Sequence, residues 1–385
     1  MKKAVMYGAG NIGRGFIGKV FSEAGYEVVF IDVVPAVVDQ LNIDREYPVR
    51  LVSNEEIREV TVKNVRAVNG MDAKAVAEEI RTADIMATAV GVNVLPRIVS
   101  NIAAGLDLRA ALPVTLDIII CENLLDADHY LRGLLQKAVK PETLDYLENK
   151  VGLVEASIGR MVPVMTGEMR EGNNLRVWVE PYEELPVDKD AFRGPTPPIK
   201  TLIPFSPFGF YIRRKLFIHN MGHALCAYFG WLKGYTYIYE AAEDKEIAAR
   251  ACDAMLNVAA ALHKDYGIPL AEIEDNVHDL IRRFGNRVLK DSIARVGRDP
   301  IRKLKSIDRL TGAALYCVQQ GTSADNILPG IAAALRFNQP GDEAATEIQQ
   351  NIAEHGIKSV IQTFCGIYDE ALIARIAAEY DKLEA

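Results

Sequence analysis

The first third of the chain alternates short apolar runs with helix-like segments. Apolar runs at residues 4–7, 26–31, 83–90, 114–121 and 151–156 have the composition of buried strands, and a helical pattern at residues 12–24 separates the first two. Strands that alternate with helices form parallel sheets covered on both faces, which is why such strands are apolar throughout. The pattern therefore predicts an α/β fold with an N-terminal, Rossmann-type, doubly wound parallel sheet.

The pattern changes twice further along the chain. Residues 165–206 mix prolines with acidic residues, and we expect an irregular passage with short strands near residues 175–179. Beyond residue 207, long alanine-rich helical patterns dominate, at residues 241–263, 270–284 and 346–364. Since 385 residues also exceed the usual size of one domain, we predict a Rossmann-type domain at residues 1–195 and a mainly α-helical domain at residues 196–385.

Composition and charge narrow the class of protein. No stretch approaches 18 uncharged apolar residues, so we expect no membrane span, and the first apolar run ends at Gly8, too early for a signal peptide. The five cysteines lie singly along the chain, which fits a cytoplasmic protein without disulfides or a structural zinc site. A net charge of −8 argues against a nucleic-acid partner.

A glycine-rich motif follows the first predicted strand and opens the first predicted helix. It reads Gly8-Ala9-Gly10-Asn11-Ile12-Gly13, a G-x-G-x-x-G pattern that lets the backbone approach a pyrophosphate at a helix N-terminus, with Arg14 adding a charge beside it. About 20 residues further on, Asp32 ends the second strand, where its carboxylate can bind ribose hydroxyls and would repel the 2′-phosphate of NADP. We therefore predict an NAD site, the alternative being a glycine turn that binds nothing.

Two further loops follow predicted strands at the same edge of the sheet. One carries Val90, and the other is the turn Cys121-Glu122-Asn123. Ligands of open α/β sheets bind at the carboxyl ends of the strands, so we expect Val90 and Asn123 to contribute to the cofactor site. Asn123 could equally be a helix N-cap or an ordinary turn residue.

The second half of the chain carries a helix face with unusual chemistry. At about 100° per residue from Lys215, His219 falls near 40°, His223 near 80° and Asn220 near 140°, within an otherwise apolar run. Burying such a set is unfavourable unless the groups bond to each other or to a ligand. The face therefore suggests proton transfer to or from an alcohol, although a solvated lysine beside core histidines has the same pattern. Two histidines alone are thin support for a catalytic zinc, so we predict no metal.

Several motifs, spread over nearly the whole chain, share a pattern with one enzyme family. They are the nucleotide loop at residues 7–18, the turn at residues 121–123, the K-x4-N-x2-H pattern at Lys215, Asn220 and His223, and the segments at residues 296–304 and 308–310. Together they resemble the polyol-specific long-chain dehydrogenases.

The resemblance implies a metal-independent NAD enzyme that interconverts mannitol 1-phosphate and fructose 6-phosphate. It further implies that Lys215 is the general base in oxidation and the acid in reduction. Asn220, helped by Asn123, would polarise the reacting oxygen, and His223 would bind and orient the substrate.

Two residues depart from the family pattern. Gly159 stands where the family usually carries an aspartate, and His219 stands where an apolar residue is usual. These departures bear on the identity of the substrate. A relative that acts on a free polyol or a hexuronate is therefore an alternative, as is a catalytically silent NAD-binding regulator.

A basic stretch at residues 282–309 holds ten Lys or Arg residues and three Asp. Such a run is most often a solvated helix face. Arg302, Lys303 and Arg309 lie in the part that resembles the family, and arginine and lysine both bind phosphate. We therefore predict that at least one of the three contacts a substrate phosphate.

Overall fold

The computed structural model describes residues 1–383 and divides into two compact units, Met1–Gly209 and Phe210–Ala385. The first unit extends beyond the boundary predicted between residues 195 and 196 and includes the segment up to Gly209. The reason is strand pairing, because β11 (Leu202–Phe205) pairs in parallel with β10 (Leu185–Asp188).

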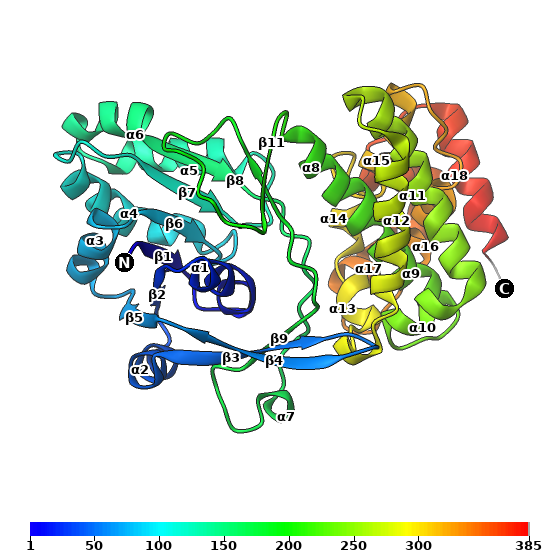
Figure 1. The fold of residues 1–385 in the computed structure, drawn as a ribbon. Coiled ribbons are helices and arrows are strands. Elements are labelled where there is room, and N and C mark those ends of the chain that lie inside the picture. Colours follow the sequence, from blue (N-terminus) through cyan, green and yellow to red (C-terminus); the bar gives the residue numbers. More distant parts are fainter. Residues whose placement is uncertain (384–385) are drawn as a thin grey trace. The chain divides into compact units, whose positions relative to one another are not determined.

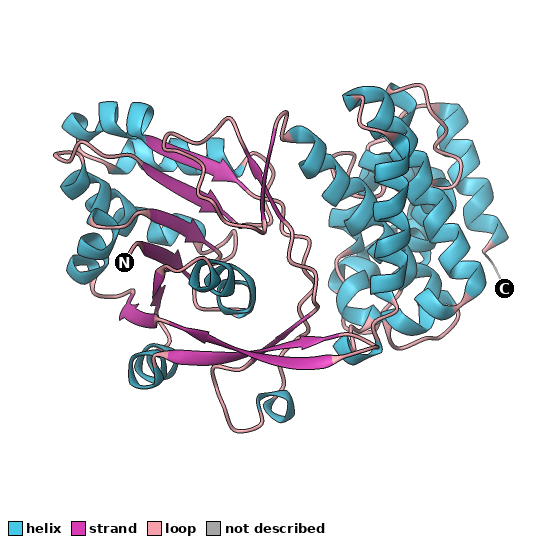
Figure 2. Cartoon of the chain, in the orientation of Figure 1, coloured by secondary structure: helices cyan, strands magenta, loops and turns pink. Residues whose placement is uncertain are grey.

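The first unit is built on a sheet of six parallel strands, which confirms the predicted Rossmann-type architecture (Figures 1 and 2). In sheet order the strands are β5 (Val65–Asn69), β2 (Glu27–Asp32), β1 (Lys3–Tyr7), β6 (Ile85–Thr88), β7 (Leu116–Ile120) and β8 (Val151–Glu155). Strand order reverses beside β1, and such a switch point is where open α/β sheets bind ligands. β5 had not been expected from the sequence.

Alternate residues of each strand enter the two hydrophobic cores of this unit. In β1, Met6 belongs to one core and Val5 to the other. The helices of this unit are η1 (Gly13–Gly18), α1 (Lys19–Glu23), α2 (Pro35–Asp44), α3 (Ala73–Arg81), α4 (Leu95–Arg109), α5 (Ala127–Ala138), η2 (Pro141–Thr143), α6 (Leu144–Lys150) and α7 (Gly167–Arg170). The predicted helix at residues 12–24 is thus a π-helical turn, η1, continued by α1.

A second sheet has three strands in the order β4-β3-β9. The sequence pattern did not predict β3 and β4. β3 (Glu46–Val52) and β4 (Ile57–Lys63) are antiparallel, and β9 (Val177–Val179) pairs in parallel with β3. β9 confirms the short strand predicted near residues 175–179.

The second unit consists of helices, as predicted (Figure 2). They are α8 (Gly209–Arg213), η3 (Arg214–Asn220), α9 (Met221–Leu232), α10 (Ile238–Glu243), α11 (Lys245–Tyr266), α12 (Leu270–Phe284), η4 (Arg287–Leu289), α13 (Ile293–Gly297), α14 (Pro300–Leu304), α15 (Thr311–Gln319), α16 (Leu328–Arg336), α17 (Glu343–Val360), η5 (Ile361–Cys365) and α18 (Glu370–Lys382). The helix predicted at residues 241–263 is divided, because the Asp244 carboxylate accepts the N–H groups of Glu246 and Ile247 and so caps the start of α11.

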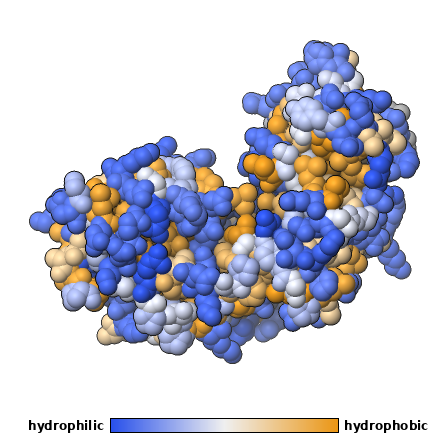
Figure 3. All heavy atoms as spheres, turned by 90° about the horizontal axis from the view of Figure 1, so that it is seen from above, coloured by the Kyte–Doolittle hydropathy of each residue, from blue (hydrophilic) through white to orange (hydrophobic). Residues whose placement is uncertain are grey.

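Hydrophilic side chains cover much of the face of both units that Figure 3 shows, in keeping with the charged fraction of 25%. In residues 1–383, no helix combines the length and the apolar character that a membrane crossing requires.

Candidate active site

The loop after β1 needs glycine at two of its three glycine positions. Gly8 has a φ of +101°, and a Cβ there would come within 2.5 Å of the Ala89 carbonyl oxygen. A Cβ at Gly13 would come within 2.0 Å of the Gly8 carbonyl oxygen. Gly10 is exposed, with no heavy atom within 4 Å of its Cβ position. The loop is therefore tightly packed on one side and open beside Gly10, as a site for a pyrophosphate requires.

Two charged side chains hold this loop. The Asp32 carboxylate, at the end of β2, accepts the Ala9 N–H at 2.7 Å and the Val34 N–H at 3.0 Å. Arg14 is 3% exposed and donates to the Ala9 carbonyl at 2.6 Å, and burial lowers the pKa of its guanidinium to about 10. Asp32 is thus fixed beside the glycine motif, with further lone pairs for a ligand, whereas Arg14 braces the loop from its buried side.

The neighbouring loops are joined by a residue to which the sequence analysis assigned no role. Glu122 is 7% exposed, and its two carboxylate oxygens accept the N–H groups of Val90 and Gly91 at 2.9 and 2.8 Å. Asn123 follows it and is exposed. Glu122 therefore holds the loop after β6 against the turn after β7. The only sequence feature that could have indicated this role is the position of a carboxylate directly after a buried strand.

The K-x4-N-x2-H motif lies on a π-helical turn of the second unit. η3 runs over Arg214–Asn220 and continues into α9, with Phe217 and Ile218 buried and Lys215 and Asn220 half-buried. Hydrogen bonds in a π-helix run from i to i+5, so residues five apart lie about one turn apart. Lys215 and Asn220 consequently come closer to one face than the angle of about 140° expected for an α-helix.

His223 is held by groups that are distant in sequence. Its Nε2 lies 3.1 Å from Oδ2 of Asp291, and its ring stacks on Phe284 at 5.0 Å between centroids and 10° between planes. Asp291 also pairs with Arg295 through its other oxygen. Burial raises the pKa of Asp291, but His223 and Arg295 outweigh it and the pKa is lowered. Asp291 therefore stays ionised beside the imidazole.

His219 lies close to several cationic groups. Burial lowers the pKa of its imidazole well below the ordinary value, and Arg283, His223 and Lys215 lower it further. His219 is therefore neutral at pH 7 and a weak proton acceptor.

The three candidates for phosphate contact gather around α14. Arg302 pairs with Asp299 at 3.1 Å, and Arg309 pairs with Asp308 at 2.8 Å. Lys303 is 3% exposed and donates to the Arg298 carbonyl, and burial together with Arg309 and Arg302 lowers its pKa to about 7. Arg302 is the most exposed of the three, and the role of all three stays a prediction.

Gly159, where the resemblance leads us to expect an aspartate, lies against an aromatic ring. A Cβ at this position would be 3.1 Å from Cε1 of Tyr182. The next residue, Arg160, is buried and donates to the carbonyls of Gly15 and Pro181, at 3.0 and 3.3 Å. This segment therefore ties the chain after β8 to η1.

Among residues 1–383, no group of three or more His, Cys, Asp or Glu side chains could hold a metal ion. The His219 and His223 rings are 6.4 Å apart between centroids. Metal independence stays a prediction.

Comparisons with known proteins cover the whole chain. Residues 2–201 match the family model of the mannitol dehydrogenase Rossmann domain, and residues 209–384 match that of the mannitol dehydrogenase C-terminal domain. The chain is 38% identical over 365 residues to mannitol-1-phosphate 5-dehydrogenase of Brevibacillus brevis, covering 94% of this chain and 93% of that enzyme.

Two solved structures have a similar fold at low identity. The Pseudomonas fluorescens mannitol 2-dehydrogenase complex with NAD and D-mannitol is 17% identical with a TM-score of 0.77, covering 99% of this chain and 92% of that one. A substrate-free D-sorbitol dehydrogenase is 14% identical with a TM-score of 0.81, covering 99% and 93%.

Proposed function

The chain belongs to the mannitol dehydrogenase family, and from this premise we propose that it is an NAD-dependent enzyme that interconverts D-mannitol 1-phosphate and D-fructose 6-phosphate. The coarser function, an oxidoreductase that acts on a polyol, follows from the family and from the 38% identical relative. The observation that carries the finer proposal is the π-helical turn that brings Lys215 and Asn220 toward one face, one turn before His223. None of the five cysteines, all within the described residues, forms a disulfide, in keeping with a cytoplasmic enzyme.

The residues of the glycine loop fit NAD. Gly8–Gly13 would hold the pyrophosphate at the open side beside Gly10, Asp32 the ribose, and Val90 and Asn123 the part toward the nicotinamide. When bound, NAD supplies the acceptor for the hydride that leaves the alcohol carbon.

The second unit supplies the groups for the proton and the oxygen. In oxidation, Lys215 Nζ takes the hydroxyl proton, and in reduction it returns that proton to the same oxygen. Asn220, helped by Asn123, donates to this oxygen and stabilises its developing negative charge. His223, held by Asp291 and Phe284, orients the substrate hydroxyls.

The substrate assignment is tested by following NADH absorbance with a panel of ketoses. We expect fructose 6-phosphate to be reduced with a kcat/KM at least tenfold above that of fructose, because Arg302, Lys303 or Arg309 binds the phosphate. A preference for fructose or for a hexuronate would instead identify the alternative substrate that Gly159 and His219 allow. No turnover of any ketose would support the silent regulator.

Cofactor choice gives a second expected result. The fixed Asp32 carboxylate would repel the 2′-phosphate of NADP, so kcat/KM with NAD should exceed that with NADP by about tenfold or more. Equal efficiencies with the two cofactors would remove Asp32 from this role.

Removal of metal ions by a chelator gives a third expected result. Since Lys215 takes the proton and Asn220 stabilises the oxygen without a metal ion in this mechanism, activity should survive prolonged dialysis against a strong chelator. Activity that is lost on dialysis and restored by added zinc would contradict the lysine mechanism.

A further inference from the structure

A cavity of about 740 Å³ lies in the first unit, at the amino ends of the sheet strands. Its lining includes Lys2, which precedes β1, Asp84, which precedes β6, and Thr115, which precedes β7. The glycine loop follows the carboxyl end of β1. The five residues of β1, at about 3.3 Å each, separate that end from the amino end by about 17 Å. The cavity is therefore separate from the cofactor site, and its volume is that of a site for a small ligand.

The charged side chains of this lining are unbalanced. Four are cationic and two anionic, namely Lys2, Arg81, Arg109, Arg193, Asp84 and Asp117. The side chains of Lys2 and Arg193 form no hydrogen bond or ion pair with any residue in the described part of the chain. Elsewhere in the same unit, Arg50, Arg66 and Arg176 each pair with two carboxylates. Arg81 pairs with Glu78 at 2.6 Å, and the charge of Arg193 lowers the pKa of Asp117 against the larger, opposite effect of burial. The positive charge of the cavity that no ion pair offsets therefore comes mainly from Lys2 and Arg193.

Both carboxylates of the lining are already engaged by backbone donors. Asp84 accepts the Lys3 N–H at 2.7 Å, and Asp117 accepts the N–H groups of Arg193 and Gly194 at 2.7 and 3.1 Å. A Cβ at Gly194 would lie 2.9 Å from Asp117 Oδ2, so the segment that carries the Arg193 side chain is held tightly. Neither carboxylate forms an ion pair with a cation of the cavity.

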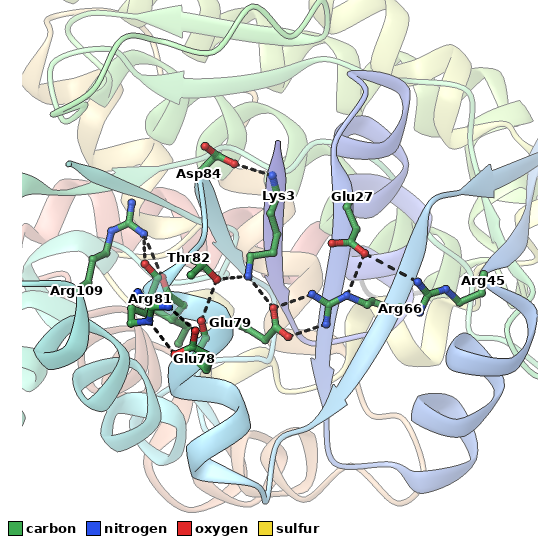
Figure 4. A network of polar contacts seen from close by, with 11 residues as sticks. Lys3, Glu27, Arg45, Arg66, Glu78, Glu79, Arg81, Thr82, Asp84 and Arg109 are labelled. Carbon is green, nitrogen blue, oxygen red and sulfur yellow. Dashed lines mark hydrogen bonds and ion pairs between the residues drawn. The ribbon is translucent and has the colours of Figure 1, made fainter. Parts of the chain in front are cut away.

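Arg109, another residue of the lining, is fixed by several hydrogen bonds (Figure 4). Arg109 is 3% exposed and donates to the carbonyls of Arg81 and Thr115, at 2.8 and 2.7 Å, and to the Tyr146 hydroxyl at 2.9 Å. Figure 4 shows Arg109 beside Arg81, and Thr82 and Asp84 both bonded to Lys3. A residue fixed in this way can present positive charge to a ligand with little reorganisation.

From these features we infer a second ligand site, at the amino edge of the sheet, for a small, multiply charged anion that carries phosphate or carboxylate groups. Arg193 and Lys2 supply the primary contacts, because both groups are unengaged and arginine matches the geometry of phosphate and carboxylate. Arg109 adds positive potential from a fixed position, whereas the charge of Arg81 is offset by Glu78.

Calorimetric titration of the NADH-saturated protein with inorganic pyrophosphate and with citrate tests this site. NADH keeps pyrophosphate out of the glycine loop, and an Arg302→Ala variant shows whether the substrate-phosphate region takes part. We expect at least one probe to bind, about tenfold or more weakly after Arg193→Ala and again after Lys2→Ala, and more weakly as salt rises. Arg302→Ala should leave binding unchanged. Binding of pyrophosphate alone would assign the site to phosphates, and binding of citrate alone to carboxylates.

Lys189→Ala is the matched control, since it removes an exposed charge from the same segment but outside the cavity lining. It should bind as the unmodified protein does. Arg193→Ala retains the backbone N–H that Asp117 accepts, and its thermal unfolding should match that of the control. Failure of both probes to bind, or equal losses in Arg193→Ala and Lys189→Ala, would overturn the inference.

Discussion

Replacing Lys215 with alanine is expected to lower kcat by about 10²- to 10⁴-fold in both directions, the range of general acid–base catalysis. The substitution removes the one group on η3 suited to exchange a proton with the substrate oxygen. His219 is near, but burial and Arg283 lower its pKa so far that it is a poor substitute. Steady-state rates with mannitol 1-phosphate and with fructose 6-phosphate measure the effect.

The rates of oxidation and reduction should depend on pH in opposite directions. Oxidation needs a neutral Lys215, so kcat/KM should rise with pH to a plateau, whereas reduction needs the protonated form and should slow as pH rises. The pKa of His219 lies well below the ordinary value, so His219 stays neutral around pH 7 and above. We therefore expect no second titration in the pH–rate profiles from this residue. Both profiles should flatten in the Lys215→Ala variant.

Two controls separate chemistry from folding. NADH affinity should be nearly unchanged, because the glycine loop belongs to the other unit. Lys245→Ala, at the exposed start of α11, removes a lysine from the same unit and should leave kcat as it is. Near-normal turnover of Lys215→Ala with an unaltered pH profile would assign the base to another residue, His219 first.

Asn220→Ala is expected to lower kcat by about 10²- to 10³-fold, the effect of losing one donor to a developing oxyanion. Asn220 ends the π-helical turn and is half-buried, so its amide is held close to the face that carries Lys215. The loss should fall on kcat more than on KM, because the donor acts most strongly in the transition state.

Asn220→Asp sharpens this test, since it keeps the size of the side chain and replaces the donor by an acceptor that repels the alkoxide. It should be at least as slow as Asn220→Ala. Asn351→Ala, on α17, is the control, because that amide bonds to the Glu347 carbonyl of its own helix. If Asn220→Ala were no slower than Asn351→Ala, the oxygen would have another donor.

Local sequence patterns were sufficient for the parts of this protein whose contacts are local or repetitive. Strands buried on both faces are apolar throughout, so β1, β2, β6, β7 and β8 were all recognisable. Gly13 packs against Gly8 within the same motif, and the motif predicted the glycine at both positions, although Gly8 itself packs against the distant Ala89. The helix that carries Lys215, Asn220 and His223 followed from their spacing, because those residues share one short segment.

Features that depend on partners distant in the chain were decided by the tertiary structure alone. β3 pairs with β9 across more than a hundred residues, and its half-polar pattern alone did not identify it. In the sequence, Asp291 is one of three aspartates in a basic stretch, and only the fold shows that it contacts His223. Likewise, only the fold shows that Glu122 accepts two N–H groups of the neighbouring loop. A periodic pattern reports which side of an element is buried, whereas the identity of what it is buried against depends on how remote segments pack.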